Sequence, residues 1–584
     1  MPKTEKRSKV ETAKENSRGL RGTIGEELQQ ATEIFTKDNV QILKFHGIYQ
    51  QDDRDLRKSL RDEGRDKAYQ FMIRLKNPGG GHLTPGQWEA LTQAADEFGD
   101  GTIRLTTRQA VQFYGLGKSR LRDLIQFLDR HLLTSFGACG DGVRNVMCCP
   151  ISSIRAGSTF DGRHWAERIA DHLGYSTSAY LDIWLDGEKL QLDSEPLFGK
   201  GYLPRKFKIA IGDPVDNCVD LLTNDIGILP ELQDGRLERF HLFVGGGMGS
   251  THGKIETYPR LAQQLTSLPP DQLLTVLTAV VETQRDLGNR SNRKRARMKY
   301  LVEELGVDGF RREVEQRLGH SLPEAEPARL ANLDLHLGWH RQRDENLHYY
   351  GLSIENGRIA DLEGYRLKTA LREIARLFQP EIMLTPSQDL ILSNIPSQLV
   401  QSVQDQLRHF GISGENLPSP LRSTSMACPA LPTCGLAITE AERRLPGLIR
   451  QLENAGFGDE SVILRISGCP NSCSRPPVAE LGLVGKSLDG YHLYVGGNRE
   501  GTRLAELFLE DVGSEQLFEV ISTLLGIHRR ERLEQESFGD TCSRLGLERL
   551  KQLFDLEVSQ HEDLSGLTES GGTYLPGNRQ RSFD

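Results

Sequence analysis

Polar residues dominate the start of the chain, and a regular alternation of apolar and polar positions begins only near Val40. Residues 1–38 are rich in Lys and Glu, with one helical stretch predicted over 23–34, and we expect a solvated extension that lies over another domain or subunit. From Val40 the segments VQILKFHGIY, FMIRLKNPGGG and TIRLTTRQAVQFYG alternate as strands do, and a helix is predicted over 84–98. Strands, helix and Gly-rich turns together indicate an α+β fold.

Two pairs of segments repeat along the chain with the same offset. IRLTTRQAVQF begins at Ile103 and IMLTPSQDLIL at Ile382, while VMCCP begins at Val146 and SMACP at Ser425. Chance matches would not share one register, so the pattern indicates an internal duplication.

A third pair, HLFVGGG at His241 and HLYVGGN at His492, has a smaller offset, which requires a short net deletion in the second copy. We therefore expect a duplicated unit, roughly 40–300 and 330–560, joined by a charged, Pro-containing linker at 311–327. The polar, Gly-rich tail after residue 560 is expected to be flexible.

The length of 584 residues predicts about three or four compact units. No run of eighteen apolar residues occurs, so no membrane span is expected, and the start MPKTEKRSKV has no apolar signal segment, which favours a cytoplasmic protein. The net charge of −9 argues against general nucleic-acid affinity.

The glycine clusters at 79–81, 245–247 and 496–497 do not have the spacing of a nucleotide-binding loop. They are expected to let the backbone lie close to a flat or bulky ligand. Because the chain has no evident site for NAD(P) or flavin, electrons for any redox reaction must come from another protein.

Four of the nine cysteines form two pairs in ACPALPTCGLA and SGCPNSCSR: Cys428 with Cys434, and Cys469 with Cys473. Five and three residues separate the partners, on turns rich in Pro and small residues that allow four thiolates to converge. Such a set suits an iron–sulfur cluster. Structural zinc stays an alternative, although its cysteine pairs are usually spaced by two to four residues. Disulfides are disfavoured in a reducing compartment.

Basic residues recur at turn-like places of the first half: Arg74, Arg104, Arg108, Arg144, Arg205, Lys206 and Lys208, followed by six more in NRSNRKRARMKY at 289–300. For a single Arg a solvated surface charge is the ordinary interpretation, and an RNA-binding stretch is the alternative for 289–300. Grouped Arg and Lys suit small oxyanions and carboxylates.

The two copies have diverged in complementary ways. The second copy has Met383 and Ser387 where the first has Arg104 and Arg108, and of the four paired cysteines only Cys428 has a counterpart, Cys149, in the first copy. The first copy has kept the cationic side chains and the second has kept the thiolates. A single site that uses both kinds of group would therefore need residues from each copy.

These motifs, with NSRGLRGTI, KFHGIYQQDDRD, RNVMCC, YLPRKFK, TQRDLGNRSNRK and SFGD, cover nearly the whole chain. On them the chain resembles the hemoprotein (beta) subunits of assimilatory sulfite reductase, in the siroheme-containing sulfite and nitrite reductase family. The resemblance implies a duplicated α+β fold with mixed sheets and the cofactors between the two halves. It implies these domains: extension 1–38, ferredoxin-like half-domain 39–135, first siroheme and substrate domain 136–310, second ferredoxin-like half-domain 328–410, [4Fe–4S] and siroheme domain 411–560, and flexible tail 561–584.

The resemblance also assigns residues. It implies a [4Fe–4S] cluster on Cys428, Cys434, Cys469 and Cys473, with Cys473 also bridging to the siroheme iron. It implies sulfite binding by Arg74, Arg144, Lys206 and Lys208, and siroheme contacts from Arg104, Arg108, Asn145, Gln284 and Arg290. Siroheme carries eight carboxylates, and burying so many charges requires a strongly cationic pocket.

The implied reaction is the six-electron reduction of sulfite to sulfide for sulfur assimilation and cysteine biosynthesis. The electrons would come from an NADPH-dependent flavoprotein subunit or from ferredoxin. A ferredoxin-dependent nitrite reductase is the nearest alternative, and a metal-stabilised scaffold that binds acidic partners is a remote one.

Overall fold

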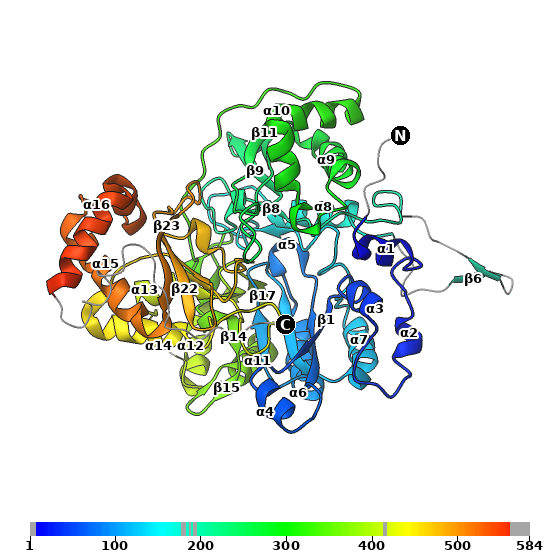
Figure 1. Ribbon diagram of the computed structural model, residues 1–584, viewed down its shortest axis with the longest axis horizontal. Coiled ribbons are helices and arrows are strands. Elements are labelled where there is room, and N and C mark those ends of the chain that lie inside the picture. The colour runs from blue at the N-terminus through cyan, green and yellow to red at the C-terminus, as the bar shows by residue number, and fades with distance from the viewer. Residues whose placement is uncertain (1–6, 177–182, 186–187, 191–194, 413–416, 561–584) are drawn as a thin grey trace. The chain divides into compact units, whose positions relative to one another are not determined.

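The computed structural model describes residues 7–176, 183–185, 188–190, 195–412 and 417–560 (Figure 1). The chain forms two compact units: unit 1, Met1–Gly247 with Arg260–Leu417, and unit 2, Met248–Pro259 with Pro418–Asp584. The flexible tail expected at 561–584 lies outside the described residues. None of the described helices combines the length and apolarity needed to cross a bilayer.

Unit 1 contains two antiparallel sheets with the same strand order. The first sheet is β1-β2-β4-β3, and the second is β12-β13-β18-β17. The strands are β1 Ile48–Asp52, β2 Tyr69–Arg74, β3 Ile103–Leu105, β4 Val111–Leu116, β12 Gly338–Arg341, β13 Leu347–Leu352, β17 Glu381–Leu384 and β18 Leu390–Pro396. A fifth strand, β14 Arg358–Ile359, extends the first sheet by pairing with β3.

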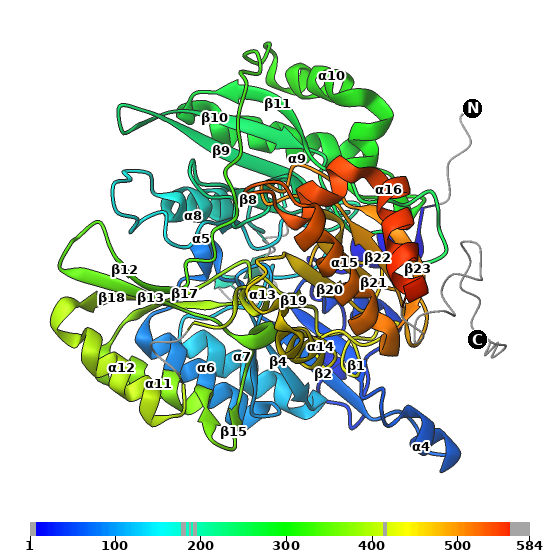
Figure 2. The ribbon, with the colours of Figure 1, turned by 90° about the vertical axis from the view of Figure 1, so that its left-hand side faces the viewer.

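Each of these sheets carries two helices, and the four helices lie in a row (Figure 2). They are α6 Pro85–Phe98, α7 Leu121–Arg130, α11 Leu367–Phe378 and α12 Val400–His409. Their apolar faces and both sheets share one core, which includes Trp88, Phe113, Leu371 and Leu392. The two half-domains therefore fold as one body within unit 1.

The second part of unit 1 is a mixed sheet in the order β11-β10-β9-β8-β5. Its strands are β5 Met147–Cys148, β8 Ile209–Ile211, β9 Ile226–Gln233, β10 Arg236–Val244 and β11 Gln263–Leu268. Three helices pack with it around an apolar core: α8 Gly162–His172, α9 Leu273–Leu287 and α10 Met298–Leu318. A separate hairpin is formed by β6 Ile183–Leu185 and β7 Glu188–Leu190.

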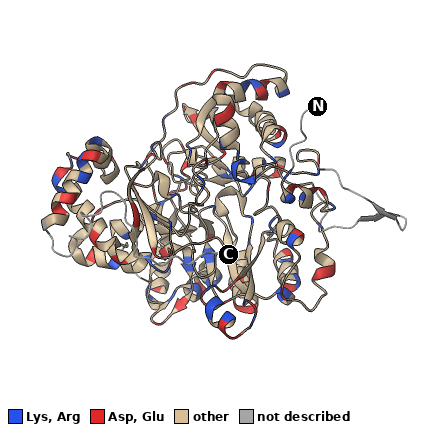
Figure 3. Cartoon of the chain, viewed as in Figure 1, with Lys and Arg blue, Asp and Glu red and all other residues tan. Residues whose placement is uncertain are grey.

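Unit 2 repeats this mixed sheet in the order β23-β22-β21-β20-β19. In both orders as written, the first two strand pairs are antiparallel and the last two are parallel. The strands are β19 Met426–Ala427, β20 Leu464–Ser467, β21 Leu481–Gly485, β22 Gly490–Val495 and β23 Glu506–Gly513, and the main helices are α14 Leu445–Leu452, α15 Leu517–Glu531 and α16 Phe538–Gln560. Charged residues of both signs lie along α16 (Figure 3). The predicted duplication and α+β fold are confirmed.

The start of the chain differs from the prediction. The segment from Val40 begins in a helix, α3 Lys37–Ile42, because Asn39 and Ile42 on one face of that helix are buried. The helix predicted over 23–34 is only α2 Ile24–Glu27. The extension is solvated only in part: residues 29–34 are exposed, but α1 Lys9–Glu15 packs on the rest of unit 1 and buries two charged side chains, Glu11 and Lys14.

One further expectation was wrong. The first part of the linker expected at 311–327 is helical, because α10 continues to Leu318. Two of the glycine clusters lie against protein backbone: a Cβ on Gly246 would lie 2.2 Å from the carbonyl oxygen of Leu222, and one on Gly497 2.2 Å from that of Ala479. Their closeness to a flat or bulky ligand stays a prediction.

Candidate functional site

A cationic group in unit 1 is organised around the buried carboxylate of Asp141. Arg293 donates to both of its oxygens, at 2.7 and 3.0 Å. The ammonium group of Lys14 lies 3.5 Å away and the guanidinium of Arg205 3.9 Å away. Burial alone would raise the pKa of Asp141, but Arg293 and Lys14 outweigh it and hold that pKa well below its usual range. The carboxylate therefore stays ionised and keeps the cations together.

Arg74 and Arg144, both predicted to bind the substrate, meet around a buried thiol. Arg74, at the end of β2, donates from Nη1 to the Cys139 Sγ at 3.1 Å, and Arg144 donates from Nε to the carbonyl of Gly140 at 3.1 Å. Although burial raises the pKa of the Cys139 thiol, the charges of these two arginines reverse the effect and lower it. Burial, together with the charge of Cys139, raises the pKa of Tyr49 to about 12.

The backbone places Lys206 and Lys208 beside the same loop. Phe207 between them is buried, its N–H donates to the carbonyl of Gly142, and its carbonyl accepts from the N–H of Arg144. Side chains alternate along such an extended segment, so both lysines point away from the side on which Phe207 is buried. The structure thus brings all four predicted anion-binding residues onto adjoining segments of unit 1.

One lysine of this region was missed from the sequence. Lys44 lies in the turn between α3 and β1, where burial and the cations Arg293, Arg205 and Arg144 lower its pKa to about 8. The only sequence signal was its place in KFHGIYQQDDRD, a segment that predicted a strand. Its proximity to these arginines comes from tertiary packing, which no local pattern reveals.

The residues predicted to hold siroheme divide into two sets. Arg104 is buried in β3, and Arg108 donates to the Asn224 Oδ1 at 2.9 Å and to the backbone carbonyl of Asn145 at 2.6 Å. Asn145 donates in return to the carbonyl of Arg108 at 2.8 Å, and its own buried amide oxygen has no hydrogen-bond partner among the described residues. Arg108, Asn145 and Asn224 thus form one connected set.

Gln284 and Arg290 lie elsewhere, on and after α9. Gln284 donates to the carbonyl of Ala296 at 2.9 Å. Arg290 pairs with Glu11 and donates to the carbonyls of Gly201 and Tyr202 at 3.2 and 2.7 Å. Since the donors of Arg290 are used to attach α1 to this loop, its geometry favours a positioning role.

The four paired cysteines of unit 2 follow two neighbouring parallel strands. Cys428 comes directly after β19, and Cys469 and Cys473 follow β20, so their loops leave the same edge of the sheet. Three non-glycine residues of these loops, Ala430, Ser472 and Arg475, have left-handed backbone conformations with φ between 50 and 62°. Such conformations make tight turns, in which Cys428 and Cys469 are buried and Cys473 is exposed.

The chemistry of these thiols fits a cationic cluster. No disulfide joins any of the nine cysteines, all of which lie among the described residues. Burial and the charges of Cys473, Cys469 and Cys434 raise the pKa of Cys428, and burial and Cys473 raise that of Cys469 to about 12. Four thiolates therefore repel one another unless a cation neutralises them, as the iron of a cluster does. The N–H of Gly468 donates to the Cys428 Sγ at 3.3 Å, a contact of the kind that tunes iron–sulfur sites.

A segment far away in the chain supports the second cysteine pair. Residues 248–259 leave unit 1 after β10 and belong to unit 2, where the N–H of Ser250 donates to the carbonyl of Pro470 at 2.8 Å. A Cβ on Gly249 would lie 3.0 Å from the carbonyl oxygen of Asn471. The segment thus packs directly on the loop between Cys469 and Cys473.

Two protein-family models match this chain, and each matches two separate stretches of it. The nitrite and sulphite reductase 4Fe-4S domain matches residues 139–322 and 463–562, and the nitrite/sulfite reductase ferredoxin-like half domain matches residues 62–131 and 340–410. The structure of the Mycobacterium tuberculosis NirA protein superposes with a TM-score of 0.75 at 24% identity, covering 93% of this chain and 96% of that one. That likeness confirms the fold.

Curated relatives match over almost their whole length. Proteins named sulfite reductase (NADPH) hemoprotein beta-component are 41% identical in Anoxybacillus flavithermus, over 92% of this chain and 96% of the relative, and 42% identical in Staphylococcus haemolyticus and Chromohalobacter salexigens, over 92% of this chain and 95% of each relative. With the repeated sheets and the four cysteines, these matches show that the chain belongs to the nitrite and sulfite reductase family of siroheme and [4Fe–4S] proteins.

Proposed function

We propose that this protein reduces sulfite to sulfide with six electrons, using a siroheme coupled to a [4Fe–4S] cluster. The proposal rests on two features of a chain that is about 40% identical to sulfite reductase hemoproteins. Four cysteines would repel one another as thiolates, and a group of cations is buried around Asp141. Nitrite reduction is the alternative, and the names of the curated relatives favour sulfite.

The residue roles follow from the chemistry of their side chains. Arg74 and Arg144 neutralise the bound oxyanion, while Lys206 and Lys208 add charge and can also donate protons, which arginine hardly does. Arg108 and Asn145, with Arg104 and, from α9, Gln284, would hold the siroheme, and Arg290 holds the segment that carries other cations. The four cysteines would hold the cluster, and Cys473 would also serve the siroheme.

When bound, the two cofactors supply single-electron transfer to the reacting sulfur. The protein's part is electrostatic: preorganised cations stabilise an anion whose oxygens gain charge and leave as water after protonation. Proton delivery falls to groups with a displaced pKa near the working pH, and Lys44, with a pKa of about 8, is such a group.

The electron donor is proposed to be a flavoprotein that oxidises NADPH, because the curated relatives are named as the beta component of an NADPH enzyme. Ferredoxin is the competing donor. Reconstitution of sulfite reduction with each donor separates the two.

Steady-state kinetics with reduced methyl viologen test the proposal. We expect sulfide to form with six electrons consumed per sulfite, and kcat/KM to be higher for sulfite than for nitrite. Lys206→Ala is expected to lower kcat/KM for sulfite about 100- to 1000-fold, the usual effect of removing one donor to a developing charge, while the siroheme absorption stays unchanged.

Lys200→Ala, which changes a lysine of the same loop region outside the predicted anion site, is the matched control. A preference for nitrite in both kcat and KM would overturn the assignment of sulfite as substrate. Loss of siroheme from Lys206→Ala would instead move Lys206 to a structural role.

A further inference from the structure

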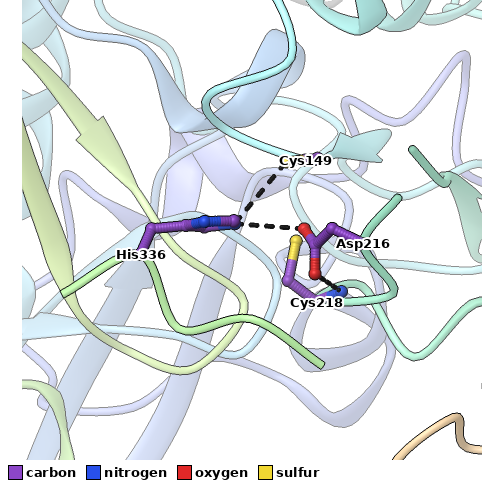
Figure 4. A group of neighbouring side chains, drawn as sticks. All are labelled: Cys149, Asp216, Cys218 and His336. Carbon is purple, nitrogen blue, oxygen red and sulfur yellow. Dashed lines mark hydrogen bonds and ion pairs between the residues drawn. The ribbon is translucent and has the colours of Figure 1, made fainter. Parts of the chain in front are cut away.

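Four buried side chains of unit 1 converge at a point that the proposed sulfite chemistry does not use: Cys149, Asp216, Cys218 and His336 (Figure 4). One possible ligand atom from each lies within 4.8 Å of those of the other three, and none of the residues is more than 1% exposed. Cys149 follows β5, Asp216 and Cys218 lie in the loop after β8, and His336 lies just before β12. Three separate segments thus bring two thiols, an imidazole and a carboxylate together.

The distances suit a tetrahedral metal ion. His336 Nε2 lies 3.6 Å from Cys149 Sγ and 3.0 Å from Asp216 Oδ2. Zinc bonds of about 2.3 Å to sulfur and about 2.0–2.2 Å to nitrogen and oxygen place tetrahedral ligands roughly 3.3–3.8 Å apart. Only small side-chain movements would be needed to seat the ion.

The surrounding groups orient these ligands as they do in zinc proteins. The Asp334 Oδ2 lies 3.3 Å from His336 Nδ1, an ion-pair distance at which its charge favours an imidazole orientation with Nε2 toward the other three ligands. Oδ1 of Asp216 accepts from the N–H groups of Cys218 and Asp334, at 2.8 and 3.0 Å, which leaves Oδ2 for the ion. Arg155 donates to Cys149 Sγ at 3.6 Å.

Charge balance also favours a divalent cation. Two thiolates and Asp216 carry three negative charges, two of which a divalent ion would neutralise; Arg155, 3.6 Å from the Cys149 Sγ, is shared with the buried Asp213 at 3.5 Å. The apolar core around the group, which includes Met147, Leu221 and Met383, makes an unbalanced charge costly.

From this geometry we propose a structural zinc site formed by Cys149, Asp216, Cys218 and His336. Two sulfurs, one nitrogen and one carboxylate oxygen are ligands typical of zinc, and four protein ligands leave no position open for a substrate. The site is closed and buried, so its task is to hold segments together.

The segments it joins are the two copies of the repeat. His336 belongs to the stretch that connects α10 to β12, and the N–H of Asn217 donates to the carbonyl of Asn332 at 3.1 Å beside it. An ion bound by Asp216 and His336 would therefore fasten this long connection, which lacks regular structure from 319 to 337, to the first mixed sheet.

Metal analysis of the full-length holoprotein, expressed with added zinc, tests the proposal. We expect one zinc per chain in addition to the iron of the cofactors. X-ray absorption at the zinc edge is expected to show two sulfur ligands at about 2.3 Å and two nitrogen or oxygen ligands at about 2.0–2.2 Å. Because the measurement is specific to zinc, the cofactors do not interfere.

Cys218→Ser and His336→Gln are each expected to lower the zinc content at least tenfold and to lower the Tm. Cys148→Ser removes a neighbouring buried thiol outside the group and is expected to retain zinc. Wild-type protein without zinc, a Cys149–Cys218 disulfide found by mass spectrometry, or zinc retained in both ligand variants would each overturn the proposal. If a ligand variant fails to fold, the wild-type zinc content and ligand distances still decide.

Discussion

Lys44 shows how a single side chain can acquire a property that its sequence does not suggest. Its ordinary pKa of 10.5 falls to about 8, first because it is largely buried and then because Arg293, Arg205 and Arg144 repel its charge. Asp141 opposes the shift, but its carboxylate is already paired with Arg293. A lysine with this pKa changes its charge within the pH range in which the enzyme can be assayed.

The pH dependence of sulfite binding is therefore expected to contain a transition near pH 8. Below it, Lys44 is protonated and adds a positive charge to the anion-binding region; above it, the charge is lost and KM rises. Lys44→Met, which keeps most of the side-chain length but never carries charge, should have the high KM at all pH values and no transition near pH 8. KM is measured in both proteins from pH 6.5 to 9.5. Sulfite itself ionises in this range, but equally for both proteins, so the difference between their KM values reports on Lys44.

The lowered pKa of Lys44 also makes the free energy of unfolding depend on pH. The unfolded chain keeps the proton of Lys44 up to a pH near 10.5, whereas the folded protein releases it near pH 8. Protonated Lys44 thus costs stability below pH 8, and that cost disappears as the pH rises from 8 to 10.5.

The KM measurements also have a contrary outcome. A transition in KM that persists in Lys44→Met would assign the titration to another group.

At the scale of elements, the two repeated hairpins β3-β4 and β17-β18 have the same turn. In each turn a threonine, Thr106 or Thr385, accepts from a backbone N–H four residues later. Gln109 and Gln388, at equivalent positions, both have a left-handed backbone, with φ of 51 and 72°. Only the first turn has gained a bridging side chain, because Gln109 donates to the carbonyls of Cys148 and Leu384, both at 2.9 Å, and accepts from the N–H of Cys148.

Gln109→Ala is expected to destabilise unit 1 by about 3 kcal/mol, because three buried backbone groups lose their partner. Differential scanning calorimetry should show the corresponding transition lowered by roughly 5 °C. Gln388→Ala is the matched control: its amide oxygen is buried and has no partner among the described residues, so its removal should cost less than about 1 kcal/mol. Equal losses in the two variants would contradict the bridging role of Gln109.

These hairpins also explain what could be predicted from the sequence. The offset shared by two pairs of segments identified the duplication, because the turn geometry needs the same residue types in both copies. The cluster cysteines were recognisable because their partners are close in the chain. Asp141 and Lys44 were missed, since they meet Arg293 only through tertiary packing and follow no fixed spacing. Cys149 and His336, 187 residues apart, have no local signal either.

At the scale of the whole molecule, the chain is not simply two consecutive halves. Unit 1 joins both ferredoxin-like half-domains, and unit 2 includes the segment 248–259 from the first copy. Gly247 and Arg260, the unit 1 residues on either side of this segment, are paired by two backbone hydrogen bonds of 2.7 and 3.0 Å. The segment can therefore be removed without opening the sheet from which it leaves.

Replacing residues 248–259 by an Asn-Gly turn should leave unit 1 folded, because a two-residue turn closes an antiparallel pair such as Gly247 and Arg260. The cysteine loop of unit 2 would lose the hydrogen bond from Ser250 to Pro470 and the close packing of Gly249 on Asn471. We expect the [4Fe–4S] cluster to be lost severalfold faster in air, measured as iron, acid-labile sulfide and absorbance over time. Ile255→Ser, at a side chain that is 95% exposed, is the control and should behave as wild type. Cluster loss at the wild-type rate in the shortened protein would mean that strands β19 and β20 alone hold the cysteine loops, and that the inserted segment has another purpose.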